Sequence, residues 1–242
     1  MNRLRNPRWR FAAVLITAAA LATILVAASQ LGAGDAKTTE PEATTASAAR
    51  TTAPEQSLFA GIEQQGVALG SPKAPVTLVE YADLQCPYCA QWARDALPTV
   101  VEDYVKTGKL RIVFHGMAFI GADSEKALRT AIAAGQENHL WDVVHGLYLS
   151  QGPENTGWVT DELVSEIASG IPDLDGEKLL DVRWESTIES GLKRAAAAAQ
   201  AAGVNSTPAF QLGPTGGRLE LVQVSSLGPE GIVPAIEAVL AR

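Results

Sequence analysis

The two cysteines of this 242-residue chain stand three positions apart, in the run Cys86-Pro87-Tyr88-Cys89. An apolar run over 76–82 comes directly before them and predicts a strand. Two thiols at this spacing can close a small ring, so each can attack or release a partner's sulfur without a metal or an organic cofactor. The pattern therefore predicts a redox-active pair at a strand–helix junction, which indicates an α/β fold.

The hydrophobic pattern around the cysteines predicts a βαβ unit. The strand over 76–82 is followed by a helix from Cys86 to about Lys106, and then by a second strand over 110–115. Pro98 lies inside the helical pattern, and we expect it to bend the helix because proline has no backbone N–H.

Helical periodicity dominates the next part of the chain. It predicts helices over 124–138, 140–149, 161–168 and 185–202, and a turn near 175–181. Thr160 is the expected N-cap of the third helix, and Gly203 closes the last one. Two short strands, over 209–212 and 219–224, and a helix over 229–240 end the chain. The predicted order is therefore βαβ, a helical insertion, then ββα.

The distribution of charge along the chain indicates which class of macromolecule it can bind. The formal net charge is −8, and the basic residues are concentrated only at the N-terminus, as Arg3, Arg5, Arg8 and Arg10. Without these four arginines the remainder stands at −12. Nucleic-acid binding needs clustered lysine and arginine that displace counterions, so the sequence argues against a nucleic-acid-binding protein.

An uncharged apolar segment follows those arginines, from Phe11 to Leu31. It reaches the roughly 20 residues that a helix needs to cross a bilayer. The arginines keep residues 1–10 in the cytoplasm, so we expect a single-pass anchor over 11–31 with the rest of the chain extracytoplasmic. The alternative is a signal peptide cleaved after Val26-Ala27-Ala28, which gives a secreted protein. No cysteine stands directly after the apolar segment, where a lipoprotein would carry its lipid, so a lipid anchor is excluded.

Residues 32–57 are rich in Ala, Thr, Ser, Glu and Pro and have no apolar periodicity. Such a segment has too few large apolar side chains to offset its conformational entropy, so we expect a flexible linker. No internal repeat is evident after it, and residues 58–242 are predicted to form one domain.

Four motifs stand in order along residues 58–240. They are GSPKAPV at 70–76, Glu80 six residues before the first cysteine, the CPYC run itself, and GVNSTPAF at 203–210. In this order they resemble the DsbA family of extracytoplasmic thiol-disulfide oxidoreductases. The resemblance implies a thioredoxin fold over 58–242 with a helical insertion at about 118–203. The sequence departs from the family where Pro87-Tyr88 contains no histidine and where Ser206 replaces a frequent glycine.

The position of the cysteines predicts their roles. Cys86 lies where the helix begins, so unpaired backbone N–H groups and the helix dipole lower its pKa and make it the nucleophile. Pro87 suits the first helical turn, where its missing N–H costs nothing. Cys89, one turn further, is expected to be more buried and to act as the resolving thiol. The alternative, a permanent structural disulfide, is disfavoured because so small a loop stabilises little.

Glu80 is the third candidate catalytic residue. In the family a matching acid lies beneath the active site, and the resemblance implies the same position here. Burial there raises the pKa of a carboxyl group, which could then carry a proton for Cys89 during exchange. The alternative is an ordinary exposed strand glutamate.

Substrate binding is assigned to Thr207, Pro208, Pro87 and Tyr88. In thioredoxin-like folds a cis proline places backbone groups against the disulfide, where an extended substrate segment can pair as a strand does. The resemblance therefore implies a cis Thr207–Pro208 bond. The Thr207 hydroxyl could also donate a hydrogen bond to the Cys86 thiolate.

A zinc site is the competing interpretation of the cysteine pair, with His139 and His145 as further ligands. On a continuous helix, however, side chains six residues apart point about 120° away from each other. We expect no metal and no cofactor beyond the redox-active disulfide, and we expect His115, His139 and His145 to be surface or packing residues.

The sequence is thus interpreted as a membrane-tethered DsbA-like oxidase that passes its disulfide to exported proteins. The resemblance implies regeneration by a quinone-linked membrane oxidase of the DsbB or vitamin K epoxide reductase type. An isomerase or reductase of the same fold is the first alternative. A non-catalytic, membrane-anchored binding module on a thioredoxin scaffold is the second.

Overall fold

The computed structural model describes residues 57–242. The predicted anchor over 11–31 and nearly all of the predicted linker over 32–57 lie outside the described residues. Among the helices that are described, none has the length and apolar character needed to span a bilayer.

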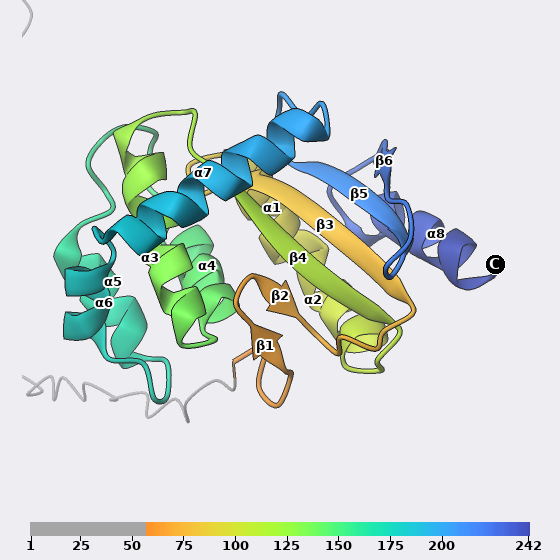
Figure 1. The fold of residues 1–242 in the computed structure, drawn as a ribbon, viewed down its shortest axis with the longest axis horizontal. Coiled ribbons are helices and arrows are strands. Elements are labelled where there is room, and N and C mark those ends of the chain that lie inside the picture. The colour runs from red at the N-terminus through yellow and green to blue at the C-terminus, as the bar shows by residue number, and fades with distance from the viewer. Residues whose placement is uncertain (1–56) are drawn as a thin grey trace, which may run out of the picture. The chain divides into compact units, whose positions relative to one another are not determined.

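A mixed six-stranded sheet forms the centre of the domain (Figure 1). Its order is β1-β2-β4-β3-β5-β6. The strands are β1 (Gln64–Gln65), β2 (Ala68–Leu69), β3 (Val76–Asp83), β4 (Leu110–Met117), β5 (Ala209–Pro214) and β6 (Glu220–Val222). β3 runs parallel to β4 and antiparallel to β5, so it has a partner on each side. All eight residues of β3 are buried, which explains its nearly continuous apolar sequence.

Helices cover both faces of this sheet. One face packs against α1 (Pro87–Asp95), α2 (Leu97–Val100) and α8 (Pro229–Leu240), through a core that includes Trp92 and Ile236. The other face carries α7 (Ser186–Ala201), which crosses in front of β3 and β4 in Figure 1. Only a small apolar cluster around Val79, Tyr81 and Ala199 fills the space on that side.

The predicted helix from Cys86 to Lys106 is interrupted. α1 ends at Asp95, with Ala96 as its C-cap, and α2 begins at Leu97. Pro98 lies in the first turn of α2, where proline cannot donate to the preceding turn. The chain then widens into a π-helical segment, η1 (Val101–Val105), in which the Lys106 amide donates to the carbonyl of Val101. Pro98 therefore divides the helix where the sequence predicted only a bend.

A block of four helices stands between β4 and α7, at the left end of the sheet in Figure 1. It consists of α3 (Ala122–Gln136), α4 (Leu140–Leu149), α5 (Asp161–Ser169) and α6 (Gly176–Val182), and with α7 it confirms the predicted insertion at about 118–203. Thr160 caps α5 as predicted, by accepting from the Leu163 amide. The prediction of a turn near 175–181 is wrong, because Asp175 caps a short helix there.

β1 and β2 were not predicted from the sequence. Each strand is two residues long, which is too short to show alternation. β2 adds to the free edge of β4, with Ala68 opposite Val113, and places Val67 beside the helical block. The outer strand near 219–224 is shorter than predicted, and β4 is two residues longer.

Candidate active site

Cys86 is the N-cap residue of α1, at the end of the loop that leaves β3. Its backbone is extended, its carbonyl accepts the first helical bond from the Ala90 amide at 3.1 Å, and Pro87 occupies the first helical turn. No side chain caps this helix end. The free N–H groups of the first turn therefore remain available to the Cys86 sulfur.

The two thiols are in different electrostatic states. The pKa of Cys86 is lowered to about 6, first by a hydrogen bond with the Cys89 thiol and further by the Thr207 side chain and the backbone amides of Cys89 and Tyr88. Burial raises the pKa of Cys89 well above its usual value, and the hydrogen bond with Cys86 raises it further. Near neutral pH the site therefore holds one thiolate, on Cys86, and one thiol, on Cys89.

Both cysteines are reduced and buried, with Cys86 5% exposed and Cys89 completely covered. Cys86 is thus less accessible than the sequence suggested, although the order of exposure is as predicted. The side chains next to it are open to solvent: Pro87 is exposed and Tyr88 is 62% exposed. Pro87 and Tyr88 thus form exposed surface next to the reactive sulfur.

Thr207 and Pro208 lie beside Cys86 although they are 121 and 122 positions further along the chain. The bond between them is cis, as expected. The Cys86 thiol donates to the backbone carbonyl of Thr207 at 3.5 Å. The carbonyl of Thr207, as well as its side chain, thus faces the reactive sulfur, and both residues remain half-buried at the edge of the site.

Glu80 lies in the interior and not on the surface. Its side chain is 2% exposed, and in the sheet it stands between Phe114 of β4 and Phe210 of β5. One carboxyl oxygen is buried without a hydrogen-bond partner, and so is the indole nitrogen of Trp92. Burial raises the pKa of Glu80 to about 8, and the nearby Trp92 lowers it in part. The alternative of an exposed glutamate is therefore wrong, and the negative charge of Glu80 also helps to raise the pKa of Cys89.

A buried polar network, which the sequence did not reveal, holds the loop before Cys86. The Asp83 carboxylate accepts from the Ser124 hydroxyl at 2.6 Å and from the Gln85, Phe119 and Ile120 amides at 2.9–3.3 Å. The Gln85 side chain in turn donates to Ser124 and Asn155, at 3.0 and 3.2 Å. The network joins the catalytic loop to the N-terminus of α3 and to the loop after α4.

A second pair of residues from the helical block reaches the same loop. Gln151, which follows α4, donates to the carbonyls of Leu84 and Cys86 at 2.9 and 3.2 Å. The Tyr148 hydroxyl donates to the carbonyl of Asp83 at 3.5 Å. These partners lie 59–65 positions from the cysteines in sequence. A lone glutamine near a helix end carries no chemical signature that would have identified Gln151.

The histidines do not join the cysteines. His115 packs edge-on against Tyr81 on the far side of the sheet, His145 packs edge-on against Phe59, and His139 stands 3.5 Å from the Asp142 carboxylate. Within residues 57–242 no three side chains of the His, Cys, Asp or Glu type cluster as metal ligands would.

Comparison with known proteins agrees with this arrangement. A family model described as thioredoxin matches residues 62–215. A probable disulfide bond formation protein D of Bacillus anthracis is 31% identical over 154 residues, which cover 62% of this chain and 70% of the relative. Its counterpart in Bacillus cereus is 33% identical over 124 residues, covering 50% of this chain and 56% of the relative. The crystal structure of oxidised BdbD from Bacillus subtilis superposes with a TM-score of 0.64 at 23% identity, over 75% of this chain and 98% of that one.

Proposed function

Because the chain belongs to the DsbA-like thiol-disulfide oxidoreductases of the thioredoxin family, we propose that it works as an oxidase and introduces disulfides into exported proteins. The observation that carries this proposal is the difference between the two thiols: the pKa of Cys86 is lowered to about 6, whereas that of Cys89 is raised. An oxidant must stabilise its reduced form, and a stabilised Cys86 thiolate does so.

The reaction begins from the oxidised form of the Cys86–Cys89 pair. A substrate thiolate attacks the Cys86 sulfur, the Cys86–Cys89 bond breaks, and Cys89 leaves as a thiolate that takes up a proton. Since Glu80 has a pKa near 8, it is protonated at neutral pH and can supply that proton. The second substrate thiolate then attacks the substrate sulfur of the mixed disulfide, and Cys86 leaves as its stable thiolate. Two electrons pass from the substrate to the cysteine pair.

We place this reaction outside the cytoplasm, with the chain held by a single-pass anchor at residues 11–31. The apolar length and the preceding arginines support this placement. A reporter fused after Arg242 should be active only outside the cytoplasm, and the full-length chain should resist carbonate extraction. A mature form that begins near Ser29 would support export by a cleaved signal peptide and contradict the anchor.

The reduced pair must pass its two electrons on before the next cycle. We propose a quinone-linked membrane oxidase of the DsbB or vitamin K epoxide reductase type as the acceptor. Deleting a candidate oxidase should trap the chain in its dithiol form in cells, as thiol alkylation followed by gel mobility would show. A chain that remains oxidised would exclude that candidate as the physiological partner.

Two assays on the purified chain test the direction of the reaction. Oxidised protein should reactivate a reduced, unfolded ribonuclease stoichiometrically, and this activity should disappear in Cys86→Ser. Efficient catalysis of insulin reduction together with slow ribonuclease oxidation would favour the reductase alternative. Preferential recovery of activity from scrambled ribonuclease would favour the isomerase. An absence of thiol-dependent turnover in every assay would leave only the non-catalytic binding module.

A further inference from the structure

A cavity that the redox chemistry does not use lies at the edge of β4, between α3, α7 and the turn that joins β1 and β2. It has a volume of about 490 Å³, within the range of roughly 300–1,000 Å³ that is typical of small-molecule sites. Neither cysteine lines it. We call it the α7 cavity, and its principal walls are formed by Val67, Phe114, Leu128, Ile132, Arg194 and Ala195.

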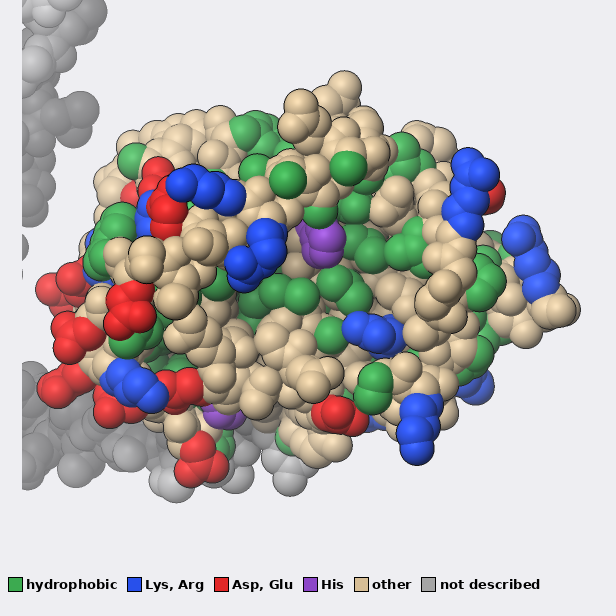
Figure 2. Space-filling view, viewed as in Figure 1, with side chains coloured by type: hydrophobic (Ala, Val, Ile, Leu, Met, Phe, Trp, Pro, Cys, Tyr) green, Lys and Arg blue, Asp and Glu red, His purple; other side chains and the backbone are tan. Residues whose placement is uncertain are grey.

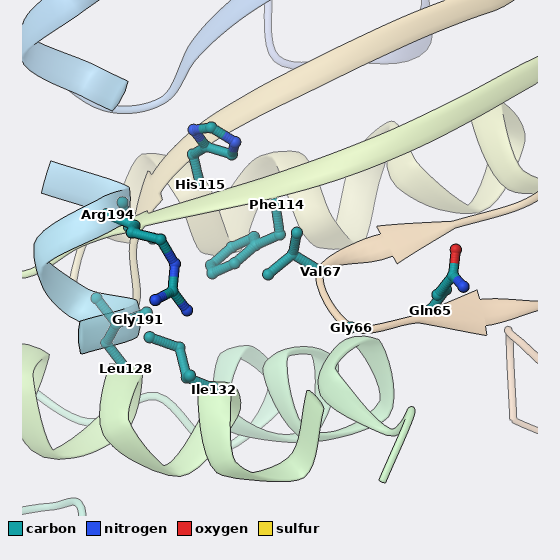
Figure 3. Close-up of a pocket in the computed structure, with 11 residues that line it drawn as sticks. Gln65, Gly66, Val67, Phe114, His115, Leu128, Ile132, Gly191 and Arg194 are labelled. Atoms are coloured by element: carbon teal, nitrogen blue, oxygen red, sulfur yellow. The ribbon is translucent and has the colours of Figure 1, made fainter. Parts of the chain in front are cut away.

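The walls of the α7 cavity are mainly apolar. Phe114 and Val67 close one side, Leu128 and Ile132 of α3 close another, and the Arg194 side chain extends into the space from α7 (Figure 3). Val67 is 40% exposed, so the apolar walls reach the surface. Phe114 and Leu128 are each only 2% exposed, so an apolar occupant would remove water mainly from Val67 and Ile132, which is favourable in proportion to the area covered.

The charge of the cavity is opposite to that of the molecule. The chain carries a net charge of −8, yet no acidic residue lines the α7 cavity. Arg129 and Arg183 form ion pairs with carboxylates, whereas Arg194 has no such partner within residues 57–242. Figure 2 shows the same contrast, with acidic side chains gathered over the helical block and basic and apolar ones over the sheet below α7. The cavity therefore favours an anionic group near Arg194.

The surroundings of the cavity also contain buried nitrogen atoms that lack hydrogen-bond partners. His115 lines both the α7 cavity and an adjoining cavity of about 330 Å³, and its Nδ1 atom is buried without a partner. Arg111 lines the adjoining cavity, and its Nε atom is likewise buried and unpaired. Buried unpaired polar atoms are uncommon in native proteins, and the Nε–H group of Arg111, which can only donate, favours an occupant that brings an acceptor.

The polarity of the walls distinguishes a lipid-like occupant from a polypeptide. A peptide in the cavity would need partners for an N–H and a carbonyl at every residue. β3 pairs with a strand on either side, and β4 pairs with β3 along its length and with β2 at Ile112 and Val113. Only the end of β4, over 115–117, has a free edge, which is too short to pair with more than a few residues of a peptide. An alkyl chain needs no such partners, and a single carboxylate needs only the donors at one end.

We propose that the α7 cavity binds a single-chain fatty carboxylate, with its alkyl chain against Phe114, Leu128 and Ile132 and its carboxylate on Arg194. Neither cysteine lines this site, which lies at the edge of β4 between α3 and α7. Occupancy of the cavity is therefore independent of the oxidation state of Cys86 and Cys89.

The test uses the full-length chain in phosphatidylcholine nanodiscs, so that no free detergent competes, and a dodecanoate that carries a photoreactive diazirine. After irradiation, peptide mapping should find crosslinks in β2, β4, α3 and α7. Excess dodecanoate should remove these crosslinks, whereas dodecyltrimethylammonium, with the same chain and the opposite charge, should not. Arg194→Glu should weaken crosslinking about tenfold, which corresponds to the loss of one charge-assisted hydrogen bond.

Lys193→Glu is the matched control, because it makes the same charge change at the neighbouring position of α7, where the side chain is 75% exposed and does not line the cavity. It should leave crosslinking unchanged, and both variants should retain wild-type thiol exchange. Equal competition by dodecanoate and by the cationic chain, or equal effects of the two substitutions, would overturn the proposal. So would crosslinks spread evenly over the surface. Should Arg194→Glu fail to fold, the competition between the two chains on the wild-type protein decides alone.

Discussion

The Gln151 side-chain amide donates a hydrogen bond of 3.2 Å to the backbone carbonyl of Cys86, and one of 2.9 Å to that of Leu84. Gln151 belongs to the helical insertion, whereas Cys86 belongs to the thioredoxin part of the fold. The insertion thus holds the peptide that places the reactive sulfur at the start of α1. It contributes to the geometry of the catalytic centre as well as to its surroundings.

Replacing Gln151 should change the chemistry of Cys86 without removing any group that touches its sulfur. In Gln151→Met the two carbonyls lose their donor while the side-chain volume is kept, so the first turn of α1 is held less firmly against the thiolate. We expect the pKa of Cys86 to rise by about one unit, the equivalent of a single hydrogen bond. Thiolate absorbance as a function of pH measures this shift. Gln200→Met, at an exposed position of α7, should leave the pKa unchanged.

The division of roles between the cysteines predicts how each variant behaves. Cys86→Ser should abolish exchange, whereas Cys89→Ser should accumulate mixed disulfides at Cys86, because no resolving thiol remains. In the reduced protein the rate of alkylation should increase with a midpoint near pH 6, the pKa of Cys86, and the label should map to that residue. Preferential labelling of Cys89 would reverse the assignment.

Glu80 should make stability depend on pH. Its folded-state pKa of about 8 is above its ordinary value of 4.5, so it favours the folded state only while protonated. Its favourable contribution to the free energy of unfolding is complete below about pH 4.5 and is lost as the pH rises to 8. Glu80→Gln keeps the shape of the side chain without its charge. The stability of this variant relative to wild type should therefore increase between pH 4.5 and 8, by roughly a few kcal/mol. Urea unfolding at several pH values measures this difference.

The same substitution tests proton transfer. If Glu80 supplies the proton to Cys89, Glu80→Gln should slow exchange near neutral pH by roughly ten- to a hundredfold, the lower part of the range for acid–base catalysis. Stopped-flow oxidation of a dithiol peptide between pH 5 and 8 gives the rate. An unchanged rate across this range would restrict Glu80 to a structural role.

Asp83 should be important for stability, because its carboxylate is fully buried and accepts from four donors. Asp83→Ala leaves those donors without an acceptor inside the protein, and we expect a loss of about 2–4 kcal/mol in the free energy of unfolding. Asp95→Ala, at an exposed position of α1, is the matched control and should change stability by less than about 0.5 kcal/mol. Equal losses in the two variants would contradict the importance of the network.

Local patterns predicted the parts of the protein whose signal is contained in a short stretch of sequence. The apolar run before the cysteines became β3, and the first cysteine became the N-cap of α1. The cis Thr207–Pro208 bond was expected from the family resemblance and is confirmed. The resemblance also implied that Glu80 lies beneath the active site, and the structure buries it.

Residues that act through distant contacts were not predictable in this way. Asn155 and Gln151 are common polar residues, and only the tertiary fold brings them to the catalytic loop from as much as 70 positions away. Hydrophobic periodicity also failed to predict the short helices and strands. β1 and β2 have too few residues to show a period, and α6 has seven residues with a single buried side chain, Leu179.

The reduction potential of the Cys86–Cys89 pair tests the central claim, that this site is built to donate a disulfide. Equilibration of the full-length chain with glutathione buffers, followed by alkylation and mass measurement, gives the value directly. A stabilised Cys86 thiolate predicts a potential between about −120 mV, as in DsbA, and about −270 mV, as in thioredoxin, on the oxidising side of that interval. The reduced protein should then melt at a higher temperature than the oxidised protein at pH 7. A potential near −270 mV, with the oxidised form the more stable of the two, would contradict the account and make the protein a reductase.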